Sequence, residues 1–221
     1  YSSFTFQVKD AGSTANSGLN VDASPNTITF DVIPVSDAPV GTDNTVIMQE
    51  DGTYTFTSSD FGYSDVSDMD ALDSVKITSL PTDGSLTLNG FAVTNNQSIS
   101  IADINNGLLQ FTPDANEFGV TYATFTFKVK DTGTTFNGGI NEQTSNSTMT
   151  VRVLPVNDAP VLANSTTITY TENDTATAIN TSISVSDIDN TTLSTATVAI
   201  TGNFNSAQDS LSFTNVPATM G

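Results

Sequence analysis

The sequence YSSFTFQVKD at residues 1–10 returns as YATFTFKVKD at residues 122–131. The match continues without a gap to PVSDAPV at residues 34–40 and PVNDAPV at residues 155–161, and 22 of the 40 aligned positions are identical. So long a match at a fixed offset of 121 residues indicates an internal repeat, which constrains the fold more strongly than any single element does.

This repeat divides the chain into three parts. Residues 1–40 form the C-terminal part of one repeat, residues 41–161 form a complete repeat, and residues 162–221 form the N-terminal part of the next. We expect the strands that the two end parts lack to come either from further repeats of a longer array or from a neighbouring molecule. The length of 221 residues corresponds to about two ordinary domains.

Short strands follow one another through the complete repeat. Runs of alternating or continuous apolar residues predict eight strands, at residues 45–48, 53–57, 74–78, 85–88, 91–94, 107–111, 124–129 and 148–153. Asn89-Gly90 predicts a type I′ hairpin turn, and residues 101–107 predict at most one short helical turn. The sequence therefore predicts an all-β chain of tandem antiparallel β-sandwich domains in a linear array.

The charge and the missing residue types exclude several functions. The chain has 24 acidic and 5 basic residues, a net charge of −19, and no cysteine, histidine or tryptophan. Disulfides, the common catalytic triads and zinc sites cannot be built, and a polyanion repels nucleic acid and anionic membranes. The sequence has no run of 18 apolar residues and no signal-peptide pattern at its start, so we expect any export signal or anchor to lie outside these residues.

The acidic residues favour loops. Twenty of the 24 are aspartate, which suits turns and calcium-binding loops better than helix surfaces. Asp10 and Asp131 end strands, Asp37 and Asp158 lie in the two proline-containing linkers, and Asp68-Met-Asp70 and Asp187-Ile-Asp189 follow those linkers by about thirty residues. We expect these carboxylates to converge at the joints between domains, where a calcium ion with six to eight oxygen ligands would offset their repulsion.

Several motifs are similar to those of known calcium-dependent repeats. Glu172-Asn173 followed by Ser186-Asp187-Ile-Asp189 resembles the cadherin order of Glu-Asn and Asp-x-Asp, and Val156-Asn-Asp-Ala-Pro160 resembles the cadherin linker. Residues 111–119, FTPDANEFG, resemble an element of bacterial cadherin-like and chondroitin sulfate proteoglycan repeats, and residues 196–213 resemble a module of giant bacterial adhesins with RTX tails. The resemblance implies a cadherin/immunoglobulin-like fold and calcium at the junctions between domains.

Two calcium sites are implied by this resemblance. The first would use Asp37, Asp68, Asp70 and Asp131. The second would use Glu50, Asp114, Glu117, Asn157, Asp158, Asp187 and Asp189. Asp10 and Glu172 would belong to junctions outside these residues. Both linkers lack the second asparagine of the animal proteins, and no Asp-Arg-Glu triplet occurs, so the number of ions at each junction stays open.

Structural alternatives apply to each of these acids. Asp10 and Asp131 also fit the caps of turns before Gly12 and Gly133, and acidic loops occur as solubility devices. Glu50 also fits a charge that protects an edge strand from aggregation. The phenylalanines at positions 4, 6, 125 and 127 repeat with a period of two and are expected in the core rather than on a sugar-stacking surface.

The leading hypothesis is a structural role outside the cell. We expect a calcium-stiffened stalk of a cell-surface or biofilm adhesin, with neighbouring domains of the same chain as its direct partners and a homophilic or surface ligand bound elsewhere in the parent protein. The alternative is a module that binds glycans or proteins through the Gly/Asn-rich loop at residues 133–147. Catalysis is not expected, because a carboxylate pair needs a cleft, whereas these acids recur from repeat to repeat.

Overall fold

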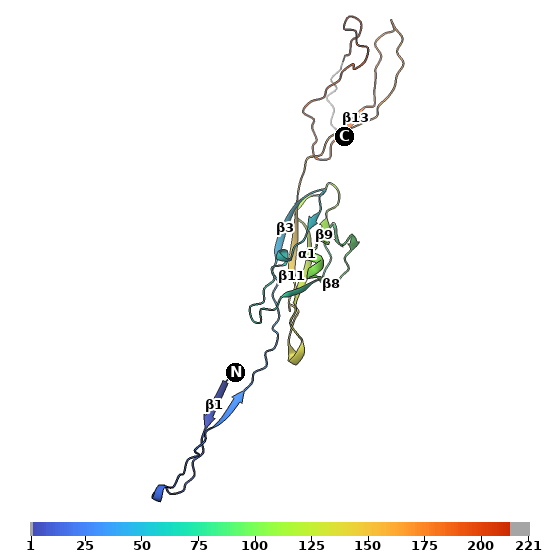
Figure 1. The fold of residues 1–221 in the computed structure, drawn as a ribbon. Helices are drawn as coiled ribbons and strands as arrows, with labels where there is room; N and C mark the ends of the chain where they lie inside the picture. Colours follow the sequence, from blue (N-terminus) through green and yellow to red (C-terminus); the bar gives the residue numbers. More distant parts are fainter. Residues whose placement is uncertain (1, 213–221) are drawn as a thin grey trace.

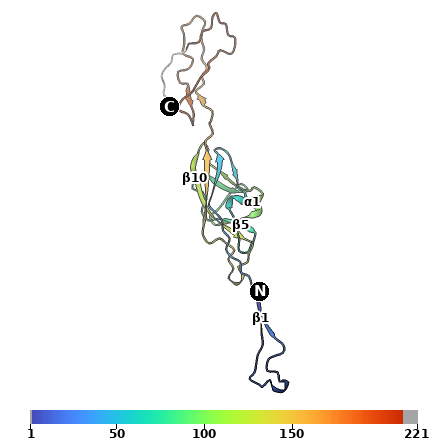
Figure 2. The same cartoon turned by 90° about the vertical axis from the view of Figure 1, so that its left-hand side faces the viewer.

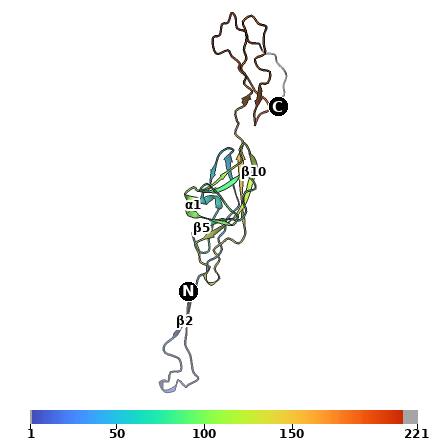
Figure 3. The ribbon, with the colours of Figure 1, turned by 90° about the vertical axis from the view of Figure 1, so that its right-hand side faces the viewer.

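The computed structural model describes residues 2–212 and is built almost wholly from β-strands. Three parts follow one another along a line: an N-terminal hairpin, a central sandwich and a C-terminal segment (Figure 1). Two views from the sides show the same order (Figures 2 and 3). The predicted first and third parts include Tyr1 and residues 213–221, which lie outside the described residues.

The larger sheet of the sandwich has five strands in the order β3-β11-β10-β5-β8. Their bounds are Asn44–Gln49, Ser147–Leu154, Gly119–Asp131, Leu72–Ile77 and Gln97–Ser100. Neighbours pair antiparallel except β3 and β11, which run parallel from Asn44↔Met149 to Gln49↔Leu154. The first and last strands of the repeat therefore lie side by side and point the same way.

The smaller sheet has four strands in the order β4-β9-β6-β7, all antiparallel. Their bounds are Tyr54–Thr55, Leu109–Thr112, Ser85–Leu88 and Phe91–Ala92. Asn89 and Gly90 have φ values of 51° and 79°, so the predicted type I′ turn is confirmed. Each of the eight predicted strands overlaps an observed one, whereas β8 was not predicted.

Short helical turns complete the sandwich. The predicted turn is α1 (Ile101–Asn105), whose N-cap Ser100 accepts a hydrogen bond from the backbone of Asp103 at 3.1 Å. Two 3-10 turns are η2 (Ser58–Phe61) and η3 (Phe136–Gly138), the latter at the tip of the β10–β11 loop. Within the described residues, no helix is long and apolar enough to cross a membrane.

The core lies between the two sheets and is rich in phenylalanine. Alternate residues of β10 point inward, so Phe125, Phe127 and Val129 are buried while the residues between them face outward. Phe127 packs edge-on against Phe61, with ring centroids 5.0 Å apart, and Phe125 packs edge-on against Phe56. The predicted core positions of Phe125 and Phe127 are confirmed.

The N-terminal hairpin repeats the β10–β11 pairing without the rest of the sandwich. It contains β1 (Ser2–Phe6), η1 (Ala15–Ser17) and β2 (Asn26–Phe30). Phe4 pairs with Ile28, and Phe125 pairs with Met149 in the equivalent register 121 residues later. Phe4 is 49% exposed, whereas Phe125 is 1% exposed, so the predicted core face of the hairpin lies open in this structure.

The C-terminal segment begins as the sandwich does. Strand β12 (Val161–Ala163) pairs with β13 (Ser184–Ser186), and Val161 lies opposite Ser186 just as Val40 lies opposite Ser64. Asn173 has a positive φ of 72°, as does Asp51 at 57° in the corresponding turn. These matches place residues 161–186 in register with residues 40–64, with one residue inserted.

Candidate metal centres at the two linkers

The loop that follows Ser64 folds around one carboxylate. Oδ1 of Asp65 accepts the backbone N–H groups of Ser67 and Asp68, and its Oδ2 accepts that of Asp70, each at 3.2 Å. Carboxylate oxygens of Asp65, Asp68 and Asp70 lie within 4.8 Å of one another. The loop therefore brings three carboxylates together, of which the sequence analysis predicted only Asp68 and Asp70 as ligands.

Asp131 meets this loop from the end of β10. Only 1% of its surface is exposed; Oδ1 accepts the Gly133 backbone N–H at 2.8 Å, while buried Oδ2 has no hydrogen-bond partner among the described residues. Burial, and then the charges of Asp70, Asp65 and Asp68, raise the pKa of Asp131. We call Asp65, Asp68, Asp70 and Asp131 the first-linker cluster.

The space beside Gly133 shows how closely the oxygens converge. A Cβ placed on Gly133 would lie 2.0 Å from Ser36 Oγ, 2.6 Å from Asp70 Oδ2 and 2.9 Å from Asp131 Oδ1. Ser36 Oγ is buried and, like Asp131 Oδ2, lacks a partner among the described residues. Three polar side chains from the linker, the loop and β10 therefore surround one point, which only glycine leaves open.

The linker contributes its backbone as well. Asp37 donates its backbone N–H to Asp68 Oδ2 at 2.5 Å, while its own carboxylate is exposed and outside the group of three. Ile140 donates to the carbonyl of Ser36 at 2.8 Å, which ties the β10–β11 loop to the linker. The structure thus brings together Asp68, Asp70 and Asp131 as predicted, and attaches Asp37 through its main chain.

Tyr63 holds the loop that contains Asp65, Asp68 and Asp70 by a hydrogen bond. Its hydroxyl donates to the carbonyl of Asp70 at 2.5 Å. Burial, followed by the charges of Asp131, Asp65 and Asp70, raises the pKa of Tyr63 to about 12. The tyrosine therefore stays neutral and acts as a hydrogen-bond donor at all physiological pH values.

The second linker carries the same backbone bond. Asp158 donates its N–H to Asp189 Oδ2 at 2.5 Å, and Asp187 Oδ1 accepts the N–H groups of Asp189 and Asn190 at 3.0 and 2.8 Å. Burial, followed by the charges of Asp189, Asp51 and Asp187, raises the pKa of Asp158. Asp187 therefore occupies the place of Asp65, and Asp189 that of Asp68, although sequence spacing had paired Asp187-Ile-Asp189 with Asp68-Met-Asp70.

Glu50 reaches the second linker from the central sandwich. It is 4% exposed; Oε1 accepts the backbone N–H of Val156 at 2.5 Å, and buried Oε2 has no partner among the described residues. Asp158 Oδ2 is likewise buried and without a partner in that part of the chain. We call Glu50, Asp158, Asp187 and Asp189 the second-linker cluster; it is looser than the first, because no three of these four carboxylates have oxygens within 4.8 Å of one another.

The remaining predicted ligands are placed differently. Asn157 Oδ1 accepts a hydrogen bond from Asn190 at 2.8 Å, so this oxygen is already engaged. Asp114 and Glu117 join Asp83 in a separate, fully exposed group within 4.8 Å. Asn116, which lies between Asp114 and Glu117 in the sequence, lines a cavity of about 520 Å³ with Asp158 and Asp187. This loop therefore reaches the second linker, whereas the carboxylates of Asp114 and Glu117 face Asp83.

The donor set of both clusters consists of oxygen alone. Carboxylates and hydroxyls are ligands of hard cations such as Ca²⁺ and Mg²⁺, whereas zinc and copper favour the histidine nitrogen and cysteine sulfur donors that this chain lacks. Two unit charges 4 Å apart repel by roughly 4 kcal/mol at an effective dielectric near 20. Buried carboxylate oxygens without partners fit a hard cation better than they fit a metal-free protein.

Comparison with known families concerns the central sandwich and its first linker. Residues 36–152, more than half of the chain, match the family described as the bacterial Ig domain. The chain belongs to the bacterial Ig domain family. The matched range of this bacterial Ig domain starts at Ser36 and ends in β11, so it contains the whole first-linker cluster. No curated protein matches the chain.

Membership of this family agrees with the fold and narrows the function. Bacterial Ig domains are typically non-enzymatic modules of extracellular or surface proteins. The all-β sandwich predicted from the repeat is therefore confirmed, and a surface-protein module is the function that the family supports. Within the matched range of this bacterial Ig domain, the first-linker cluster is the feature with the clearest chemistry.

Proposed function

We propose that this chain is a stretch of an extracellular stalk, part of a cell-surface adhesin, whose linkers stiffen when calcium occupies the two linker clusters. The observation that carries the proposal is Asp131, a carboxylate 1% exposed, with an unpartnered oxygen beside three further carboxylates. In the absence of a cation, burial and repulsion destabilise its charged form. A divalent ion offsets both effects.

The proposed stiffening acts through the main chain of each linker. Asp37 and Asp158 are held by Asp68 and Asp189, which belong to the proposed ligand sets. An ion that fixes Asp68 or Asp189 thereby fixes the direction in which the linker leaves the following sandwich. At the second linker, Glu50 adds a ligand from the preceding sandwich, so that ion would contact both sides of the joint.

Extracellular calcium is the appropriate cation on energetic grounds. Extracellular modules bind calcium with dissociation constants of about 10⁻⁴ to 10⁻³ M, a concentration that external calcium reaches and cytosolic calcium does not.

The repeat boundaries 1–40, 41–161 and 162–221 belong to the same proposal, supported by the shared register of the hairpin and of residues 161–186. Each linker would then join two successive sandwiches of one array.

The deciding experiment is solution scattering of the chain with calcium and with EDTA. Calcium should lengthen the maximum dimension and narrow the distribution of particle shapes. Asp189→Asn should remove most of this change while leaving one calorimetric binding event, at the first linker. Asp68→Asn should leave most of this change, with one calorimetric binding event at the second linker. Identical scattering in calcium and EDTA would refute the stalk proposal, and the absence of any calorimetric binding would refute the metal sites.

A further inference from the structure

All five basic residues of this acidic chain occur on one kind of surface. Lys128 and Lys130 lie at outward positions of β10, between the buried residues Phe127, Val129 and Asp131. Lys76 and Arg152 lie at the partly exposed positions of the neighbouring strands β5 and β11. The fifth, Lys9, bridges to Val21 as Lys130 bridges to Glu142 in the next repeat. Four cations therefore share the outer face of the five-stranded sheet.

Two of these cations lie where they disfavour the sheet. Lys128 lies directly opposite Lys76 on the adjacent strand, and like charges in that position destabilise a sheet. Lys76 contacts Glu142 at 3.3 Å and Lys130 contacts Asp73 at 3.8 Å. Lys128 donates to the carbonyl of Thr144, and within residues 2–212 Arg152 has no carboxylate partner. The face therefore keeps two cations that no carboxylate neutralises.

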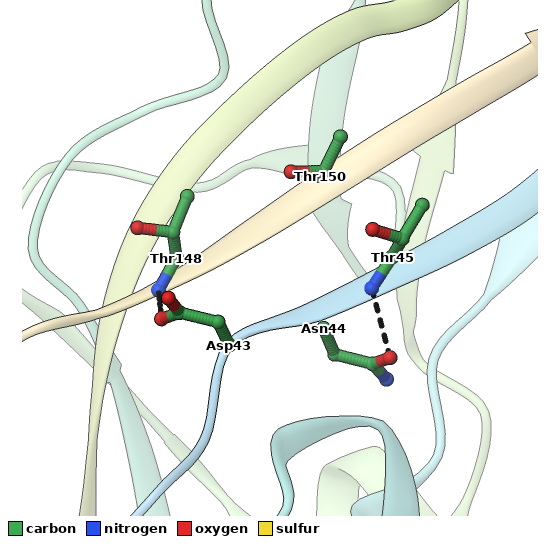
Figure 4. Close-up of a pocket in the computed structure, with 5 residues that line it drawn as sticks. All are labelled: Asp43, Asn44, Thr45, Thr148 and Thr150. Atoms are coloured by element: carbon green, nitrogen blue, oxygen red, sulfur yellow. Dashed lines mark hydrogen bonds between the residues drawn. The ribbon is translucent and has the colours of Figure 1, made fainter.

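Threonine hydroxyl groups occupy much of the rest of this face, beside Ile47, which is 54% exposed. Across the strands, Thr150 lies opposite Thr124 on one side and opposite Thr45 on the other. Thr148 and Thr150 on β11 and Thr45 on β3 surround an open cavity of about 510 Å³, whose rim Asp43 and Asn44 complete (Figure 4). No hydrogen bond of these three threonine hydroxyls occurs among the described residues. They are free to bind a ligand.

We propose that the outer face of the five-stranded sheet binds an acidic polysaccharide. The lysines and Arg152 pair with the carboxylates of the polymer, and the threonine hydroxyls bind its hydroxyl groups in the open cavity. Threonine, lysine and arginine at these outward positions provide no aromatic ring for stacking a neutral sugar. A face that carries cations on three neighbouring strands fits a long polymer, whose many weak ionic contacts add along its length.

Another copy of this chain fits the face less well. The acidic clusters of the chain lie in the linker loops and in the exposed group around Asp83, not on an extended strand that could follow the sheet. The overall charge of −19 opposes approach of any polyanion at long range, but charges farther apart than about 10 Å are largely screened at 0.1 M salt. Local pairing with the cations then decides the binding.

The test uses the whole chain in EDTA, so that calcium bridges to the acid clusters play no part. The probe is polygalacturonate at 0.1 M and at 1 M salt, where the net charge of the chain is screened beyond about 10 Å and about 3 Å, with dextran of the same length as the neutral control and polyglutamate as the acidic-peptide control. We expect polygalacturonate alone to bind, with an affinity that falls as salt rises. The double variant Lys128→Gln/Lys130→Gln should weaken binding about tenfold, and Lys128→Arg/Lys130→Arg should restore it.

A matched variant separates this face from net charge. Thr191→Asp/Ser194→Asp makes the chain more negative by the same two charges at exposed positions outside the sandwich, and it should leave binding unchanged. An equal loss in this variant would overturn the proposal, as would equal binding of dextran, equal binding of polyglutamate, or no binding at 0.1 M salt. Circular dichroism of each variant should show the unchanged β-sheet spectrum.

Discussion

The backbone N–H of Asp37 donates to Oδ2 of Asp68 at 2.5 Å, across 31 residues of chain. Asp158 and Asp189 form the same bond at the next linker, also 31 residues apart. Each linker is therefore attached to a loop of the repeat that follows that linker. The attachment point is a carboxylate oxygen of Asp68 or Asp189, and each of these carboxylates lies near other carboxylates. The proposed metal binding and the linker geometry are coupled through this one side chain.

Asp131→Asn should change stability in opposite directions with and without calcium. In EDTA the amide removes a buried charge and its repulsion, so the free energy of unfolding should rise by about 1 kcal/mol, while Asn Oδ1 still accepts from Gly133. With calcium at 100 times its dissociation constant, the wild-type chain should gain about 2.7 kcal/mol that the variant loses. Thermal unfolding in both buffers measures this, and Asp174→Asn, which is exposed, should change neither value.

The pH dependence in EDTA should have an unusual sign. The raised pKa of Asp131 means that the folded chain binds its proton more readily than the unfolded chain does. Its contribution to stability therefore falls as pH rises from the ordinary value of 3.8 through the raised value, and the penalty is complete above that. Urea unfolding from pH 4 to 7 should show this slope in the wild type and a reduced slope in Asp131→Asn; parallel profiles would contradict it.

Gly133→Ala should abolish the first calcium site. The new methyl group would lie 2.0 Å from Ser36 Oγ and 2.6 Å from Asp70 Oδ2, so the oxygens must separate. Gly202→Ala is the matched control, because no atom lies within 4 Å of the corresponding methyl position. Terbium luminescence titration should show one site fewer in Gly133→Ala and the wild-type number in the control. An unchanged number in both variants would show that the ion is bound elsewhere.

Two equivalent phenylalanines should respond differently to truncation. Phe125→Ala leaves a cavity in a buried position and should cost about 3–5 kcal/mol. Phe4→Ala, at the same place in the preceding repeat, should cost less than about 1 kcal/mol, because Phe4 is half exposed. Urea unfolding of both variants gives the comparison. A cost for Phe4→Ala near that for Phe125→Ala would reveal that other strands cover the hairpin in solution.

The repeat predicts the strands well, because alternation of apolar residues reports directly on burial. Strand β8 escaped prediction because Gln97-Ser-Ile-Ser has a single apolar residue, Ile99, too few to define a period. The parallel pairing of β3 with β11 also could not be predicted, since alternation gives the face of a residue but not the direction of its partner strand.

The candidate sites were predicted in part for a similar reason. Asp68, Asp70 and Asp131 converge as the sequence suggested, but Asp65 was not predicted because it lies outside the Asp-x-Asp motif. The recurrence of Ser64-Asp65 as Ser186-Asp187 was the available clue. Asp114 and Glu117 face Asp83 because tertiary folding, which spacing along the chain does not record, turns that loop toward the start of β6.

The parallel pair β3–β11 determines how the sandwich carries tension. The chain enters β3 at one pole and leaves β11 at the opposite pole (Figure 1), so a pull on the two linkers drags these strands past each other along their length. The paired residues from Asn44↔Met149 to Gln49↔Leu154 are then pulled in shear, so the hydrogen bonds between the two strands must break together instead of one after another. The sandwich is thus built to resist stretching between its linkers.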